Sequence, residues 1–353
     1  MAKAVRKINL ALQGGGAHGA FTWGVLDRLL EEEDLEFSAI SGTSAGAMNA
    51  VVMAEGLLEG DRAFARAQLE SFWMGMAAAG EKLAPFRALP WYKMIEGFVY
   101  EASVAYTRMF SPYDFSAGDT NPLRKALTDL IDFERVQKNR KIKLFINTTH
   151  VATGGLRCWR EHELTVEMVL ASACLPSLFQ TPMIDGEGYW DGGYIANPAI
   201  EPMLRCTDTD DVLIVQLNPI VRKLLPRKAH DIVDRLSEIS FNASLITELR
   251  FIGERNRLIN SGDLSADKFR KTHLHMIHGD QALGDLPGST KLVAERNSLL
   301  KLRDMGRAAA SAWLEAHGDH IGKRSTFNYR KMVAMLTQET DETPSEVALL
   351  NRD

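Results

Sequence analysis

The chain has 353 residues, enough to bury a sizeable core in one large domain or two ordinary ones. Its hydrophobic content of 45%, charged content of 25% and net charge of −5 are ordinary for a globular protein, and they give no general electrostatic reason to bind nucleic acid. The three cysteines suggest neither a disulfide framework nor a set of metal ligands, and the N-terminus has no signal-peptide apolar core. We therefore expect a cytoplasmic protein.

Two glycine-rich turns lie close together near the start of the chain. The first, GGGAHG at 14–19, follows an apolar run at 8–12, and the second, GTSAG at 42–46, follows another at 37–41. Each turn opens onto a helical pattern, and the pattern after the second turn is small and apolar enough for a buried helix. The second turn reads G-x-S-x-G, the nucleophile elbow, in which a sharp strand-to-helix bend exposes a serine, here Ser44.

A serine nucleophile needs hydrogen-bond donors for the oxyanion that forms after attack. Flexible glycines can turn backbone N–H groups towards one point, so the first turn predicts an oxyanion hole built by Gly14, Gly15, Gly16 and Ala17. Nucleophile and oxyanion hole then both lie within the first fifty residues. The sequence thus looks like that of a serine acyl hydrolase.

The rest of the chain alternates between strand and helix patterns. Helices are predicted over 61–76, 164–173, 232–260 and 292–317, and strands over 142–147, 156–159, 211–217 and 272–277. This alternation predicts an α/β fold, a three-layer sandwich around a mainly parallel sheet, with the nucleophile elbow between an early strand and a buried helix. The polar tail after about residue 321 is expected to be partly mobile.

A catalytic acid is offered by Asp191, which lies in the sequence Trp190-Asp191-Gly192-Gly193. The two glycines suit a tight turn that brings the carboxylate close to a hydroxyl group. A turn-forming aspartate without a catalytic role is the alternative.

These motifs, in this order, resemble those of the patatin-like phospholipases. The resemblance rests on the glycine-rich loop at 14–19, G-x-S-x-G at 42–46, A-S-A-C-L-P at 171–176 and D-G-G at 191–193, and it spans about residues 5–220. It implies a Ser–Asp dyad in which Ser44 forms an acyl-enzyme with a lipid acyl group. Asp191 would accept the serine proton and then activate the deacylating water. The other glycines of the motifs are Gly19, Gly42, Gly46, Gly192 and Gly193.

The resemblance implies a phospholipase A-like hydrolase of carboxylic esters in lipid degradation, with a lipid substrate and without a metal or an organic cofactor. We expect the acyl hydrolase domain over residues 5–280 and a C-terminal helical extension over 281–353. An aromatic- and methionine-rich cap or insertion is predicted at about 72–115, where large apolar side chains suit acyl chains or a bilayer surface. Packing within a helical layer is the alternative.

The pattern at 231–260 is a further candidate for an interaction surface. Its apolar residues and arginines suit a peripheral contact with anionic lipid or a homodimer, and a solvated helix flank is the alternative. The family's first loop usually has arginine or lysine where this chain has His18. Since histidine is largely neutral at neutral pH, we expect His18 to pack the loop rather than to act in catalysis.

A Ser–His–Asp triad esterase is the first alternative, because His230, His273, His275 and His278 all follow Asp191. However, His273 and His275 alternate along a predicted strand, which places both on one face. The H-x-H-x-x-H spacing is also one that metal-binding histidines can have, although no carboxylate cluster accompanies it in the sequence. We expect each to be a strand or loop histidine.

A non-catalytic or nucleotide-binding α/β module is the second alternative. Residues 14–19 also satisfy G-x-G-x-x-G, the dinucleotide fingerprint, which needs an acidic residue about twenty positions on at the end of the second strand. The chain has SGTS at 41–44 there, and Glu36 lies before the predicted strand. The spacing therefore favours the hydrolase.

Overall fold

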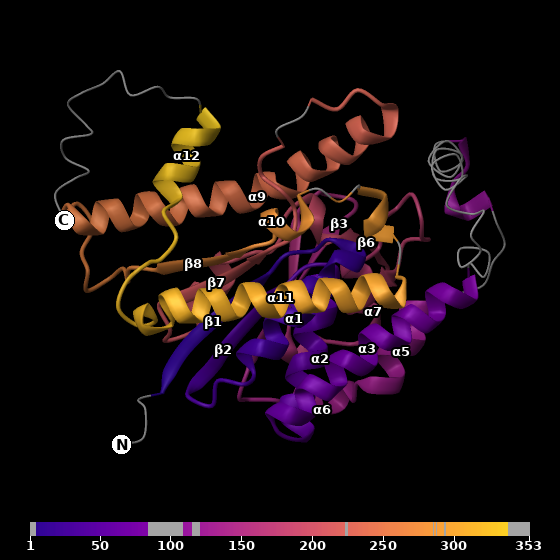
Figure 1. Ribbon diagram of the computed structural model, residues 1–353, viewed down its shortest axis with the longest axis horizontal. Helices are drawn as coiled ribbons and strands as arrows, with labels where there is room; N and C mark the ends of the chain where they lie inside the picture. Colours follow the sequence, from indigo (N-terminus) through magenta and orange to yellow (C-terminus); the bar gives the residue numbers. More distant parts are fainter. Residues whose placement is uncertain are drawn as a thin grey trace.

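The computed structural model describes residues 5–83, 109–114, 121–222, 225–284, 286, 288–292 and 294–337 (Figure 1). Most of the cap predicted at about 72–115 and the end of the tail, 338–353, thus lie outside the described residues. Within the part described, no helix is both long enough and apolar enough to span a membrane.

One sheet forms the centre of the fold. In the described residues it has eight strands, in the order β5-β6-β3-β2-β1-β7-β8, with β4 paired to β3. Their bounds are β1 (Arg6–Leu12), β2 (Leu35–Gly42), β3 (Lys143–His150), β4 (Leu156–Arg160), β5 (Met183–Ile184), β6 (Glu187–Asp191), β7 (Asp211–Gln216) and β8 (His273–His278). The neighbours β3, β2, β1, β7 and β8 run parallel, whereas β4, β5 and β6 pair antiparallel.

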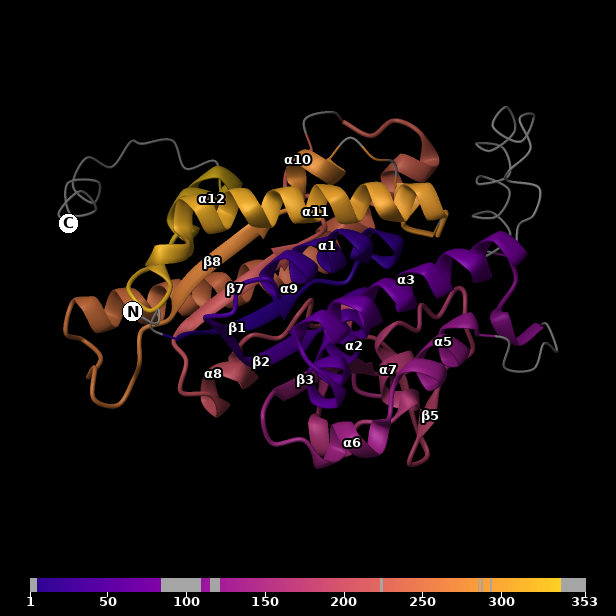
Figure 2. The same cartoon turned by 60° about the horizontal axis from the view of Figure 1, so that its bottom comes forward.

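Helices cover both faces of this sheet (Figures 1 and 2). They are α1 (Gly19–Leu29), α2 (Ala45–Glu59), α3 (Arg62–Leu83), α5 (Pro122–Leu130), α6 (Phe133–Lys138), α7 (Val166–Ser172), α8 (Glu201–Cys206), α9 (Ala229–Asn260), α10 (Asp280–Leu283), α11 (Arg296–His317) and α12 (Tyr329–Thr337). Short 3-10 helices include η1 (Gly16–His18), η5 (Gly192–Tyr194) and η6 (Gly288–Leu292). The predicted three-layer α/β sandwich with a mainly parallel sheet is confirmed.

The alternation of side chains along the strands creates two cores. In β1, Leu10 and Leu12 join a core with α1, α2, α3 and α11, whereas Ala11 points to the opposite core. The second core is closed by α9 through Leu245 and Leu249. Burial on both faces explains why these parallel strands read as continuous apolar runs.

Helix α11 packs so closely on α1 that each of the two helices has a glycine where they cross. A Cβ atom on Gly24 would overlap the backbone of Arg303, and one on Gly306 would overlap the backbone of Phe21. Two close approaches between backbones therefore fix the C-terminal helix on the same core as the first helix.

Two predicted segments, the C-terminal tail and the cap, lie only partly within the described residues. Tail residues 329–337 form α12, whose Met332 is buried in the second core, because Tyr329 packs where Gly253 of α9 has no side chain. At the start of the predicted cap, Phe72 and Trp73 of α3 are buried in the core that α3 shares with α1 and α2. Residues 84–108 and 115 of the cap lie outside the described residues.

Candidate active site

The predicted nucleophile elbow is a sharp turn between β2 and α2. Ser44 has φ 54° and ψ −122°, a left-handed backbone conformation that side-chain-bearing residues rarely adopt. The glycines on either side make the turn possible: a Cβ atom on Gly42 would lie 2.5 Å from the carbonyl oxygen of Gly46, and one on Gly46 would overlap Leu12. The turn leaves Ser44 half-buried at the start of α2.

Hydrogen bonds from distant parts of the chain hold this strained turn. The Ser44 N–H donates to Oγ of Ser172 (3.0 Å), and that hydroxyl donates to the carbonyl oxygen of Asn147 (2.7 Å). The Asn147 side chain donates to the carbonyl oxygen of Gly42 (3.1 Å) and to Oγ1 of Thr43 (3.2 Å). These buried bonds compensate for backbone strain of about 1–3 kcal/mol at the serine.

The register of the sheet brings Asp191 next to Ser44. Ile146 of β3 pairs with Gly42 at the end of β2, and Thr148 of β3 pairs with Asp191 at the end of β6. The antiparallel strand β6 thus delivers its last residue to the edge where β2 turns into the elbow. The Ser44 hydroxyl hydrogen-bonds to the Asp191 carboxylate.

The environment of Asp191 contains little that stabilises a negative charge. The residue is 1% exposed, and its Oδ1 accepts the N–H of Gly193 (2.7 Å). Burial raises the pKa of Asp191 to about 7, although the hydrogen bonds from Gly193 and Ser44 act in the opposite direction. A carboxylate with this pKa exchanges a proton near neutral pH.

The ASACLP stretch at 171–176 links the two sides of the site. Its Ser172 accepts the Ser44 N–H, and the carbonyl oxygen of its Cys174 accepts the N–H of Asp191 (2.8 Å). One short segment therefore sets the position of both the serine and the carboxylate.

The glycine-rich loop lies against the serine side chain. A Cβ atom on Gly14 would lie 2.8 Å from Cβ of Ser44. Gly16 has φ +58°, and a Cβ atom there would overlap the backbone of Lys291. The Gly14 N–H donates to Oδ1 of Asn197 (2.6 Å), so this predicted donor is already paired. Since the first N–H groups of a helix have no partner within it, those at the start of η1 suit an oxyanion.

Ordinary packing accounts for His18 in this loop. It is 2% exposed, and its Nε2 lies 2.7 Å from Oγ1 of Thr290. Burial, followed by the positive charges of Lys291 and Arg222, lowers the pKa of His18 to about 3. Its ring is therefore neutral at physiological pH, as a loop-packing role requires.

The histidines that a catalytic triad would need lie elsewhere in the fold. His273 and His275 share one face of β8 as predicted, and both contact Asp211 at the amino end of β7 (3.3 Å and 2.8 Å). His278 contacts Gln216 and lies three strands from β2, about 14 Å away. His230 lies near Asp231 at the start of α9 (3.1 Å).

The described residues support neither a dinucleotide site at the glycine loop nor a metal site. Glu36 is the second residue of β2, 4.0 Å from Lys7 at the amino edge, which is the wrong edge for a ribose bound at the glycine loop. Among the described residues, no three histidine, cysteine, aspartate or glutamate side chains are grouped to hold a metal ion.

Fold and site together define an α/β protein of the nucleophile-elbow type, with a buried carboxylate beside the serine. The chain belongs to the patatin-like phospholipase family, whose family model matches residues 10–204.

Two individual proteins resemble the chain. A patatin-like phospholipase domain-containing protein of Caenorhabditis elegans is 29% identical over 213 residues, which are 58% of this chain and 13% of that protein. The chain thus spans about an eighth of the length of this relative. The crystal structure of VipD from Legionella pneumophila aligns over 88% of this chain and 67% of that chain, with 15% identity and a TM-score of 0.39.

Sequence reasoning did not find three polar residues of the site. Asn147, Ser172 and Asn197 carry no catalytic motif of their own, yet each hydrogen-bonds a predicted site segment. A usable signal existed only for Ser172, which lies in the stretch at 171–176 that carries the family resemblance.

Proposed function

We propose that the chain is a phospholipase A-like serine hydrolase that cleaves carboxylic esters of lipids with Ser44 and Asp191 alone. The observation that carries the proposal is the hydrogen bond from a strained serine to a buried carboxylate whose pKa is raised to about 7 by burial. A hydroxyl group is a weak nucleophile until a neighbouring base takes its proton.

In the acylation step, Oγ of Ser44 attacks the ester carbonyl carbon while its proton moves to the Asp191 carboxylate. The carbonyl oxygen becomes an oxyanion, for which the N–H groups of Gly15, Gly16 and Ala17 are the proposed donors; Gly14 shapes the loop. When the intermediate collapses, the carboxylic acid of Asp191 returns the proton to the leaving alcohol. The acyl group is then bound to the serine as an ester.

Deacylation repeats this sequence with water. Asp191, again a carboxylate, takes a proton from the water molecule that attacks the acyl-enzyme. It then donates that proton to Oγ of Ser44 as the fatty acid leaves. The position of Ser44 at the start of α2 adds a favourable helix dipole for negative charge near its oxygen.

Apolar rings beside the dyad support a lipid acyl chain as the substrate. Tyr194 follows the DGG motif, and its ring meets that of Phe241 edge to face at 5.6 Å. Exposed Ile232, Leu236 and Ile239 on α9 support the proposed peripheral contact with a lipid surface. A homodimer through this helix is the competing proposal.

The test is active-site titration with a fluorophosphonate probe, followed by peptide mass spectrometry. We expect one equivalent of label, bound at Ser44, and loss of all labelling in Ser44→Ala. Ser237→Ala, an exposed serine on α9, is the matched control and should label normally. Hydrolysis of a lipid panel with mass analysis of the products then defines the substrate. A folded Ser44→Ala protein that still cleaves lipid esters would refute the proposal.

A further inference from the structure

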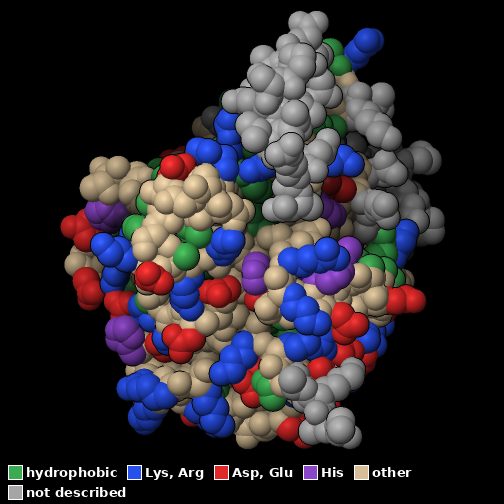
Figure 3. Space-filling model, turned by 90° about the vertical axis from the view of Figure 1, so that its left-hand side faces the viewer, with side chains coloured by type: hydrophobic (Ala, Val, Ile, Leu, Met, Phe, Trp, Pro, Cys, Tyr) green, Lys and Arg blue, Asp and Glu red, His purple; other side chains and the backbone are tan. Residues whose placement is uncertain are grey.

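A cavity lies at the edge of the sheet opposite Ser44. It is about 270 Å³ in volume, and its walls come from α8, α9, the loop between α9 and β8, and the residues just before β7 and β8. Its lining residues are Leu204, Arg205, Thr209, Asp210, Arg255, Lys268, Phe269, Arg270 and Thr272. The end of the molecule where α9 stops faces the viewer in Figure 3, which shows several lysine and arginine side chains there, interspersed with acidic ones.

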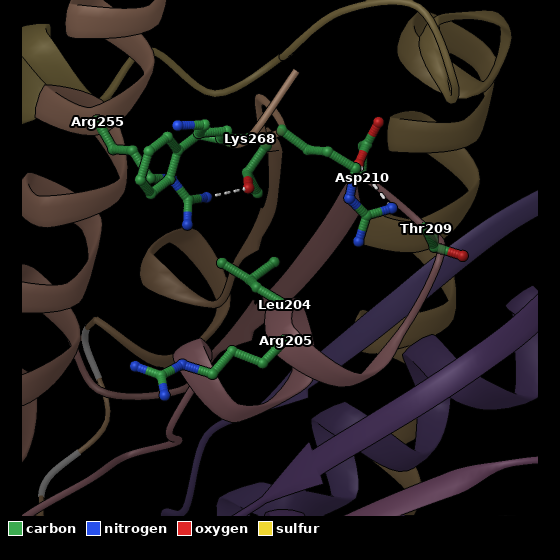
Figure 4. A pocket seen from close by; sticks show the side chains of 9 residues that line it. Leu204, Arg205, Thr209, Asp210, Arg255 and Lys268 are labelled. Atoms are coloured by element: carbon green, nitrogen blue, oxygen red, sulfur yellow. Dashed lines mark hydrogen bonds and ion pairs between the residues drawn. The ribbon is translucent and has the colours of Figure 1, made fainter. Parts of the chain in front are cut away.

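The charges around this cavity do not balance. Of the four cationic side chains that line it, Arg270 pairs with Asp210 (3.3 Å), and Arg205 pairs with Glu201 of its own helix. Arg255 and Lys268 have no carboxylate partner within the part of the chain that the structure describes. Figure 4 shows these two side chains approaching the cavity from α9 and from the loop that follows it.

Arg255 is the residue that most requires an anion. It is half-buried, and its guanidinium donates one hydrogen bond, to Oγ1 of Thr272 (2.6 Å). Its buried Nε has no hydrogen-bond partner among the described residues. Burial and then the charge of Arg270 lower the pKa of Arg255, against the opposing charges of Glu201 and Asp210. A guanidinium in this setting is stabilised by an anion that accepts its remaining N–H groups.

We propose that this cavity binds a phosphate group, with Arg255 as the buried anchor and Lys268 at the rim. Two uncompensated cations match the charge of a phosphate monoester, and the guanidinium fork matches its oxygen geometry. A volume of about 270 Å³ accommodates a phosphate with a small substituent but not a lipid acyl chain.

The phosphate in this cavity is not the headgroup of a lipid whose ester is at Ser44. The cavity adjoins the amino ends of β7 and β8, whereas Ser44 follows the carboxyl end of β2. The six residues of β7 alone separate the two edges by roughly 16 Å. The inference therefore does not depend on the proposed hydrolysis.

The experiment has a soluble arm and a membrane arm. Calorimetric titration with sn-glycerol 3-phosphate, and with glycerol as the phosphate-free match, tests a soluble ligand. Cosedimentation with vesicles of ether-linked phosphatidic acid, against ether-linked phosphatidylcholine, tests a lipid headgroup without offering a carboxylic ester to cleave. Both arms use the full chain at low salt and at 0.15 M salt, because charge-dominated binding weakens as salt rises.

We expect binding in at least one arm, weakened about tenfold or more by Arg255→Gln and less by Lys268→Gln. Arg250→Gln removes an exposed arginine of α9 that does not line the cavity, and it should bind like the parent chain. Should Arg255→Gln fail to fold by circular dichroism, the exposed Lys268 provides the test. The proposal is overturned if neither arm shows binding, or if both cavity variants bind as tightly as the parent.

Discussion

Two aspartates at opposite edges of the sheet are almost equally buried and titrate in opposite directions. Asp191 is 1% exposed and Asp211 is 2% exposed. Burial raises the pKa of Asp191 to about 7, because the groups that hydrogen-bond to it, Gly193 N–H and the Ser44 hydroxyl, carry no charge. Burial also acts to raise the pKa of Asp211, but the hydrogen bonds from His273 and His275 outweigh it and lower the pKa to about 2.

The difference distinguishes the proposed proton acceptor, Asp191, from a structural carboxylate, Asp211. At the amino edge, Asp211 joins β8 to the C-terminal segment, since it also accepts the N–H of Gly322 (2.9 Å) and His275 contacts Thr326 (2.8 Å). At the carboxyl edge, Asp191 has a serine hydroxyl as its partner, and among the described residues no cation stabilises its charge. Burial alone therefore does not identify a catalytic carboxylate; the partners do.

The largest expected effect comes from replacing each aspartate in turn. Asp191→Asn removes the proposed proton acceptor and keeps the shape, so kcat/KM for ester hydrolysis should fall about 10²–10⁴-fold. Asp211→Asn should leave turnover per folded molecule near that of the parent. Steady-state kinetics on protein checked by active-site titration make the comparison.

The histidines complete this test. His230, His273, His275 and His278, each changed to glutamine, should retain catalysis apart from losses of folded protein. Loss of turnover comparable to Ser44→Ala in one folded histidine variant would replace the dyad with a triad, since a serine and its base act as a unit.

The next effect concerns the glycine loop. Gly16→Val should lower kcat about 10²–10³-fold, because a β-branched residue resists φ +58° and meets the backbone of Lys291. Gly15 has φ 178°, so positive φ is not the reason for a glycine there. Gly154→Val is the matched control, with φ +67° but open space around it, and it should change stability alone. Equal kinetics for the two variants would move the oxyanion hole elsewhere.

The aspartates at the two edges should also differ in their effect on the free energy of unfolding. A pKa lowered from 3.8 to about 2 means that ionised Asp211 stabilises the fold above pH 3.8, and that this contribution is lost as pH falls towards 2. Asp211→Asn should therefore cost about 2–3 kcal/mol at pH 6 in urea unfolding. The cost should shrink as the pH approaches 3. A pH-independent cost would assign the effect to packing instead of charge.

The pH dependence of hydrolysis reports the other carboxylate. Below about pH 7 Asp191 holds a proton in the free enzyme, so kcat/KM should fall up to tenfold for each further pH unit. A profile that stays flat from pH 7.5 to 5.5, with the protein folded throughout, would show that Asp191 is not the base.

The sequence was sufficient for the parts of the fold that depend on local patterns. The parallel strands and the buried helix after Ser44 were predicted to within a few residues, because each is an apolar run, and β1 and β2 are in addition followed by glycine-rich turns. The β5–β6 hairpin was missed because both strands are short, although Asp185-Gly186 is a hairpin signal and both residues have positive φ.

The candidate site was predictable only where it coincides with a motif. The serine, the carboxylate and the glycine loop have recognisable neighbours in the sequence. The bond between Ser44 and Ser172 joins residues 128 positions apart, and that between Gly14 and Asn197 joins residues 183 apart. No local pattern encodes such pairs. The same holds for the basic cavity, whose arginines come from different elements.

The smallest expected effect is a gain in stability at the carboxyl edge, where the proposed proton acceptor lies. Because the pKa of Asp191 rises from 3.8 to about 7 on folding, the folded chain holds its proton more tightly than the unfolded chain. Stability contributed by this group is thus present below about pH 4 and is lost as pH rises through 7. Asp191→Asn should abolish that loss and stabilise the protein at pH 8.

The full pKa change corresponds to about 4 kcal/mol, but asparagine also needs hydrogen bonds when buried, so we expect a gain of about 1–2 kcal/mol. Urea unfolding of the parent and of Asp191→Asn at pH 8 and pH 4.5 measures it, and the difference should shrink at the lower pH. This gain would run opposite to the loss in Asp211→Asn, where the same change of carboxylate to amide removes a stabilising charge. A variant that is less stable than the parent at pH 8 would mean that the carboxylate at the carboxyl edge also holds the fold together.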